Sequence, residues 1–147
     1  MVFDEEPTAA TYVKGMDQLG YDGAGAGLLA YPGGKTLHFG TGIHLGLKND
    51  ARIYGTDGWI EVESPWFCAP ESSVVVHAPG KEPVHYQEGT AGDDLYAAEA
   101  DAVAENLERG ECPAMTKEDT RRQARAIDML KQSAGMRFAP DLPQIAS

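Results

Sequence analysis

The sequence predicts an α+β fold, in which an open-faced, mainly antiparallel sheet of about six or seven strands is followed by two carboxy-terminal helices. The stretch 35–63 alternates apolar and polar residues and contains an Asp-Gly pair, a pattern typical of consecutive strands joined by a tight turn. Helical spacing of apolar residues begins only after residue 93. Strands first and helices afterwards favour this fold class over a parallel sheet of βαβ units.

The first strand of this central stretch is expected to have one apolar face, because alternate residues of an extended chain point to opposite sides. One side would carry Leu37, Phe39, Thr41, Ile43 and Leu45. The other side would carry Thr36, His38, Gly40, Gly42 and His44.

The next two strands, 51–55 and 59–63, form a predicted hairpin. The pair Asp57-Gly58 is expected to supply the positive φ angles of a tight turn between them. Ile60 and Val62 would then face inward, and the outward face would carry Trp59, Glu61 and Glu63.

Two strands are expected before this stretch, at 8–17 and 21–31, and they are joined by a turn at Leu19-Gly20. Pro32 and Gly33 occupy the positions that a type II turn favours, so this segment predicts a second hairpin. Glycines gather on the two strands of that hairpin: Gly23, Gly25, Gly27, Gly40 and Gly42. If the register brings them together they form a shallow trough that another backbone, helix or subunit can approach, and the alternative is a bend or bulge.

Two short strands, 73–77 and 83–88, follow an apolar loop at 66–70 that is expected to fold over a sheet edge. A first helix is predicted to begin at Asp93 or Asp94, to run through Arg109 and to end at Gly110. Its apolar face would contain Tyr96, Ala100, Val103 and Leu107. The run Thr116 to Asp119 resembles a capping box for a second helix, which Gly135 ends and whose apolar stripe contains Ala124, Ile127, Leu130 and Ala134.

Length and charge limit the classes of protein to which this chain can belong. A chain of 147 residues fits one domain, expected over 1–138, with a loosely held tail at 139–147. A formal net charge of -11 argues against nucleic acid and anionic membrane surfaces as partners. No apolar run approaches the ~20 residues that span a bilayer. Cys68 and Cys112 lie far apart with no secretory signal, which predicts reduced thiols and a cytoplasmic location.

Motifs that bind cofactors or metals are not found in the context that they need. The run from Gly25 to Ala30 matches G-x-G-x-x-A, but no helix pattern follows it, so we interpret these residues as strand glycines. The four histidines lack metal-ligand spacing, and His38 and His44 would lie about 20 Å apart on one strand. No catalytic, cofactor or metal residue is assigned. The candidate substrate contacts are His38, His44 and Tyr96, although Tyr96 also fits a core anchor.

The hairpin ARIYGTDGWIEVESP resembles the Gfo/Idh/MocA oxidoreductases, the family of glucose-fructose oxidoreductase and inositol dehydrogenase. Their carboxy-terminal domains commonly carry a similar A-R-x-x-G-T-x-G-x-I-E stretch. Three other segments fall in the same order as in that family, so that the resemblance spans 7–138: GAGAGLLAYPGGKTLHF, YAAEADAVAENLERGECP and AIDMLKQSAGMRF.

This resemblance implies a substrate and oligomerisation domain whose sheet pairs subunits in a homo-oligomer and forms one wall of a cleft for a sugar-like or polyol substrate. The family's amino-terminal Rossmann domain, which binds NAD or NADP, its Glu-Lys-Pro lysine and its Asp/His pair have no counterpart in this chain. The chain alone is therefore expected to be inactive, because hydride transfer needs a bound nicotinamide.

Two other functions stay open. The chain could be a stand-alone module that binds a small carbohydrate-like ligand without chemistry. It could also be a complete small enzyme that uses His38 or His44 as its base.

Overall fold

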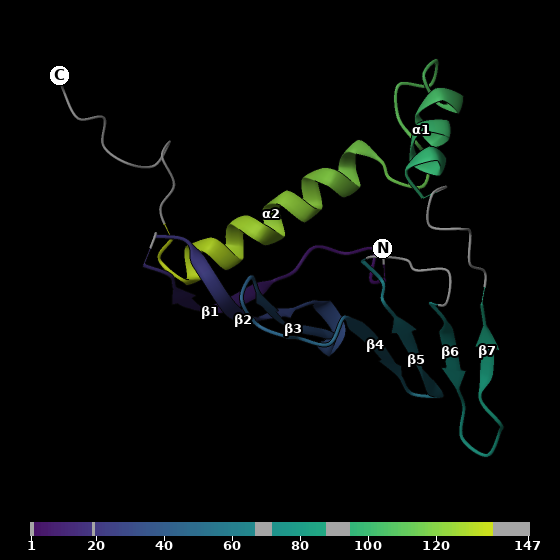
Figure 1. Cartoon of the computed structure of the whole chain (residues 1–147), viewed down its shortest axis with the longest axis horizontal. Coiled ribbons are helices and arrows are strands. Elements are labelled where there is room, and N and C mark those ends of the chain that lie inside the picture. Colours follow the sequence, from purple (N-terminus) through teal and green to yellow (C-terminus); the bar gives the residue numbers. More distant parts are fainter. Residues whose placement is uncertain (1, 19, 67–71, 88–94, 137–147) are drawn as a thin grey trace. The chain divides into compact units, whose positions relative to one another are not determined.

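The structure is a computed structural model that describes residues 2–18, 20–66, 72–87 and 95–136 (Figure 1). The described residues form two antiparallel sheets and two helices, which confirms the α+β class. The chain divides into two compact units, residues 1–47 with 113–147, and residues 48–112. Each unit is described by itself. The expected single domain over 1–138 stays a prediction, and the expected tail at 139–147 lies outside the described residues.

The first unit contains a three-stranded sheet, ordered β1 (Ala9–Met16), β2 (Asp22–Ala30) and β3 (Thr36–Gly42). The predicted turn between β2 and β3 is confirmed: Gly33 has φ 72° and ψ 17°, values that the third position of a type II turn requires. Along β2 the side chains alternate, with Gly27 and Leu29 buried and Ala26 and Leu28 exposed. The sheet therefore has one covered face and one open face.

The predicted glycine trough is wrong, because the register places the two sets of glycines on opposite faces. Gly25 pairs with Thr41 and Gly27 with Phe39, whereas Gly40 pairs with Ala26. A Cβ atom at Gly25 would lie 2.0 Å from the Tyr12 hydroxyl, and one at Gly27 would lie 2.4 Å from the Phe39 ring. The strand glycines therefore make room for two aromatic rings. At Gly23 the alternative prediction of a bulge is correct, since the register between β1 and β2 shifts there.

Helix α2 (Lys117–Ser133) covers this face and lies across β1 and β2 (Figure 1). Its predicted capping box is confirmed, with the Thr116 hydroxyl accepting from the Asp119 amide and the Asp119 carboxylate accepting from the Thr116 amide at 3.0 Å. Its predicted end is also confirmed. Gly135 has φ 61°, and the Met136 amide donates to the Lys131 carbonyl as in a Schellman motif.

The predicted apolar stripe of α2 is only half right. Leu130 lies over the sheet, because its Cδ2 atom would be 3.3 Å from a Cβ atom at Gly27. Ala124 is exposed, however, and Ile127 is 43% exposed. The half-buried apolar positions of the helix and its C-cap follow a neighbouring stripe instead: Ala126, Met129, Leu130 and Ala134. Two overlapping stripes fit one helix, and contact with the sheet selects between them.

The predicted single sheet is replaced by two, because β3 ends at Gly42 and does not continue to Leu45. The Leu45 side chain folds back over Gly42, where an added Cβ atom would lie 2.9 Å from its Cγ atom. The Leu47 amide then bonds to the Leu45 carbonyl only two residues earlier. A tight local turn therefore ends the strand, and Ile43 is 66% exposed.

The second unit contains a four-stranded sheet, ordered β4 (Asp50–Gly55), β5 (Gly58–Glu63), β6 (Val74–His77) and β7 (Val84–Tyr86). Directly opposite residues of antiparallel strands share a face. One face is apolar throughout and includes the inward pair predicted from the sequence: Ala51, Ile53, Ile60, Val62, Val74, Val76, Val84 and Tyr86. The loop at 66–70 lies outside the described residues except for Trp66, which is 68% exposed.

The hairpin between β4 and β5 forms as predicted, but the expected backbone angles do not. Gly55 pairs with Gly58, so the loop is Thr56-Asp57, and of these turn residues only Gly58 has a positive φ, 150°. A Cβ atom at Gly58 would lie 2.1 Å from the His77 carbonyl oxygen. Close approach of the β6 backbone is therefore the main reason for glycine at this position.

Helix α1 (Leu95–Glu105) ends before the predicted residue Arg109, and its predicted cap at 93–94 lies outside the described residues. The Asn106 side chain donates to the Ala102 carbonyl at 2.9 Å, and the following amides bond three residues back. These bonds tighten the chain into turns that Gly110, with φ 74°, brings to an end.

Candidate functional site

The structure does not bring the three predicted substrate contacts into one described pocket. His38 is exposed on the open face of the first sheet, opposite Leu28. His44 lies beyond the end of β3, where its Nε2 atom is 3.1 Å from the Tyr21 hydroxyl. Tyr96 belongs to the other unit and is 77% exposed on α1, so it is not a core anchor there. The substrate-binding role of these residues stays a prediction.

A row of stacked rings crosses the second sheet on the face opposite to its apolar face. The Tyr54 and Trp59 rings lie 6.0 Å apart at 27°, and the Trp59 and His77 rings lie 3.7 Å apart at 3°. The strand register causes this stack, because Tyr54 pairs with Trp59 and Trp59 pairs with His77. We call these three residues the aromatic row.

The aromatic row has both a free surface and a buried polar atom. Tyr54 is 67% exposed at the edge strand, so the outer side of the row is accessible. The His77 Nε2 atom is buried and has no hydrogen-bond partner among the described residues. All three residues line a shallow hollow of about 390 Å³ at the hairpin tip. Flat rings beside polar groups suit a ligand that has both an apolar face and hydrogen-bonding edges, as sugars and nucleobases do.

Charged side chains continue from the aromatic row along the same face. Arg52 contacts Glu61 at 3.0 Å and Asp50 at 3.4 Å, and Lys48 reaches the same two carboxylates at 3.7 Å and 3.4 Å. The hydrogen bonds that Arg52 donates to the Glu61 carboxylate raise the pKa of Arg52 further above its already high value. The four charges neutralise one another, which makes this part of the face polar without a strong local field.

Sequence reasoning assigned Trp59 outward but missed the aromatic row. The sequence does contain a signal for the first pair of rings in the row, since a two-residue loop at Thr56-Asp57 sets Tyr54 opposite Trp59. No sequence signal sets the register between β5 and β6, so His77 could not be added to the row from the sequence.

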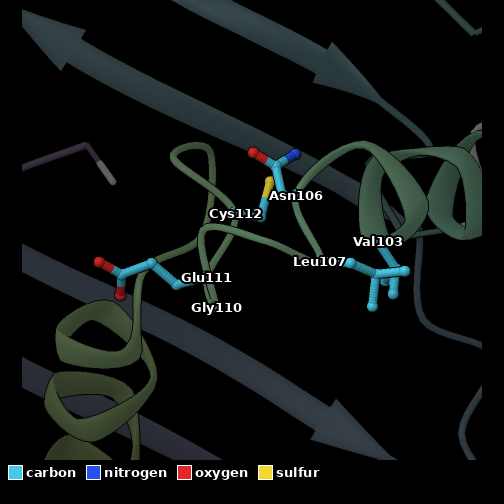
Figure 2. A pocket seen from close by; sticks show the side chains of 6 residues that line it. All are labelled: Val103, Asn106, Leu107, Gly110, Glu111 and Cys112. Atoms are coloured by element: carbon cyan, nitrogen blue, oxygen red, sulfur yellow. The ribbon is translucent and has the colours of Figure 1, made fainter.

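A second hollow, of about 230 Å³, lies at the carboxyl end of α1 (Figure 2). It is lined by Val103, Asn106, Leu107, Gly110, Glu111 and Cys112. Figure 2 shows the Glu111 side chain directed away from the other labelled side chains. Val103 and Leu107 are 58% and 71% exposed, so this is a shallow, mainly apolar depression beside a free thiol.

Within the described ranges, no group of three or more His, Cys, Asp or Glu side chains could hold a metal ion. The run from Gly25 to Ala30 lies in β2 and leads through a short turn into β3, so it lacks the helix that a dinucleotide fingerprint needs. Neither described helix is long and apolar enough to cross a membrane.

The geometry thus defines two units, each with an antiparallel sheet and one helix, and an aromatic row on the sheet of the second unit. No protein-family model matches the chain, and no curated protein matches it. Among solved structures it is similar to two mutants of KijD10, a 3-ketoreductase from Actinomadura kijaniata, each in complex with TDP-benzene and NADP. The TM-scores are 0.69 and 0.68, at 19% and 20% sequence identity, over 88% of this chain. At this identity the likeness shows the fold alone, and this chain spans 41% of the length of that reductase.

Proposed function

We propose that the chain is the substrate-binding and oligomerisation domain of a Gfo/Idh/MocA-type oxidoreductase that acts on a sugar-like or polyol substrate. One observation carries the proposal: the fold of a 3-ketoreductase that was crystallised with NADP extends over 88% of this chain. The hairpin at 51–65 supports the proposal independently, because its resemblance to the family rests on the sequence alone. NAD or NADP would be bound by a Rossmann domain of a full-length parent, and this chain alone would be inactive.

Cofactor binding tests the first part of the proposal. Calorimetric titration of the 147-residue chain with NADPH and NADH is expected to give no binding, because hydride carriers need a nucleotide-binding domain, and none of the described segments forms one. Tight binding of either nucleotide by this chain would contradict the proposal. Reading the genomic sequence upstream of Met1 is the matching test, and we expect a G-x-G-x-x-G segment between a strand and a helix.

Substrate binding tests the second part. A ligand that binds only the folded state raises the melting temperature, so a panel of sugars, polyols and sugar nucleotides can be screened by thermal shift. We propose His38, His44 and Tyr96 as the contacts, and the shift should shrink in His38→Ala or Tyr96→Ala. The alternative, a stand-alone carbohydrate-binding module, is favoured by the aromatic row, and it predicts instead that Trp59→Ala abolishes the shift.

Self-association tests the third part, and adjacent residues provide a matched pair of variants. Val84 is 50% exposed on the apolar face of the second sheet, whereas its neighbour His85 is exposed on the opposite face. If the apolar face pairs subunits, Val84→Glu should dissociate the oligomer because it buries a charge, and His85→Glu should not. Sedimentation measures the outcome, and a strict monomer at high concentration would refute this part.

A further inference from the structure

The amino-terminal segment of the first unit is paired residue by residue with cations. We call residues 4–6 the acidic segment, and we call Lys35, Arg122 and Arg125 the basic cluster. Each carboxylate of the acidic segment contacts one cation of the basic cluster: Asp4 with Arg122 at 2.6 Å, Glu5 with Lys35 at 2.7 Å, and Glu6 with Arg125. Three consecutive acidic residues therefore pair with two arginines of α2 and with a lysine beside the turn between β2 and β3.

The fold builds the basic cluster whether or not the acidic segment occupies it. Arg122 and Arg125 are one turn apart on α2, and Lys35 follows the turn between β2 and β3. Among the described residues, Glu118 lies 3.6 Å from Arg122 and 3.8 Å from Arg125, and the Asp119 carboxylate also acts on Arg122. Without the acidic segment, the three cations of the basic cluster would outnumber these two carboxylates, in a chain whose net charge is -11.

The acidic segment is held mainly by ion pairs between exposed or half-exposed side chains, although the Glu5 Oε2 atom itself is buried. The Asp4 and Glu6 side chains are 83% and 44% exposed, and ion pairs in water contribute little net stability. Asp4 also has φ 46°, a backbone angle that costs energy for a residue other than glycine. Just before the segment, the Phe3 ring packs edge-on against Tyr31 at 4.8 Å. Ion pairs of this kind can open without unfolding α2 or the sheet.

We propose that the basic cluster is a binding site for a diphosphate group and that the acidic segment occupies it as a built-in competitor. Paired guanidinium groups bind phosphate oxygens two at a time, and a lysine adds a mobile point charge. A diphosphate presents several negative charges on adjacent groups, as the three carboxylates do, but on a smaller and more rigid body. This inference rests on the charges of the first unit and does not depend on the proposed oxidoreductase function.

Calorimetric titration with inorganic pyrophosphate at low ionic strength tests the proposal. The triple variant Asp4→Asn, Glu5→Gln, Glu6→Gln removes the competing charges, and its dissociation constant should fall by about tenfold or more, because a site that is mostly occupied has its apparent affinity reduced by the free fraction. Equal affinity in the triple variant and the native chain would overturn the competitor role. No binding to either protein would overturn the site itself.

Two additions to the triple variant test which residues bind. Adding Arg122→Gln and Arg125→Gln should abolish pyrophosphate binding, while adding Arg121→Gln should leave it unchanged, since Arg121 contacts Glu118 and is 62% exposed. Circular dichroism checks that α2 persists in each protein. A synthetic peptide of residues 2–8 provides the other probe. If that peptide binds the triple variant and pyrophosphate does not, the site recognises acidic peptides and the diphosphate assignment is wrong.

Discussion

The aromatic rings of the two sheets stack in similar ways but differ in how exposed they are. In the first sheet the Tyr12 and Phe39 rings lie over Gly25 and Gly27, and α2 covers that face, so that Tyr12 is only 9% exposed. In the second sheet the rings of the aromatic row stack on one another, and Tyr54 remains 67% exposed. Glycine beneath a ring lets the ring lie down and leaves a surface that a helix can cover. The Tyr12 and Phe39 rings also stack, with centroids 6.2 Å apart, so the two sheets differ in whether the stacked rings are covered and not in whether they stack.

The largest expected effect is a loss of stability of the second sheet. In Gly58→Ala the new methyl group would meet the His77 carbonyl, and the backbone would be held at a φ of 150° that alanine resists. Backbone strain and overpacking together should cost about 3 kcal/mol of unfolding free energy. Both tryptophans, Trp59 and Trp66, lie in residues 48–112, so urea unfolding followed by tryptophan fluorescence measures this unit. An unchanged fluorescence midpoint would mean that β6 does not approach Gly58 as described.

A somewhat smaller effect is expected in the first sheet, because a side chain can yield where a backbone cannot. Gly25→Ala would displace the Tyr12 ring and should cost about 2 kcal/mol, measured by the loss of helical circular dichroism in urea. Gly40→Ala is the matched control, since its Cβ atom would meet nothing nearer than a backbone oxygen at 4.0 Å. Equal losses in both variants would contradict the role of Gly25 as space for the ring.

Tyr12 is also fixed by a hydrogen bond from its hydroxyl group to Asp22 at 2.9 Å. Burial, and then this bond, raise the pKa of the Tyr12 phenol above its ordinary value. Tyr12→Phe keeps the ring but removes the bond, and should cost about 1 kcal/mol in urea unfolding. Tyr54→Phe is the comparison in the second sheet and should change little, because Tyr54 is exposed. A larger loss at Tyr54 would reverse the contrast between the sheets.

The smallest expected effect concerns the capping box that begins α2. Hydrogen bonds from the Thr116 hydroxyl and then from its backbone amide lower the pKa of Asp119 below its usual range. A carboxyl group whose pKa is lower in the folded state stabilises the fold above its unfolded pKa, and this stabilisation is lost as pH falls through the folded value. The difference in urea midpoint between the native chain and Asp119→Asn should therefore be present at neutral pH and should shrink below about pH 4. A difference that grows with acidity would contradict the assignment.

Local signals predicted most of the elements correctly, because they act over a few residues. The Thr116 box begins α2, Gly135 ends it, and the turns at Gly33 and Gly58 connect the strands that were expected. The exceptions have local physical causes that periodicity does not display. Asn106 ends α1 early through its own side-chain bond, and Leu45 folds back on Gly42 and ends β3.

The candidate sites depended on pairing between segments that are distant in sequence. Strand register decides whether Gly25 pairs with Gly40 or Thr41, and whether Trp59 pairs with His77. A shift of one residue would turn every side chain to the other face. The ion pairs between residues 4–6 and α2 join positions more than a hundred residues apart. The sequence by itself therefore determined the fold class and the order of its elements. Only the tertiary structure decided which residues share a surface, because alternative registers satisfy the same local preferences equally well.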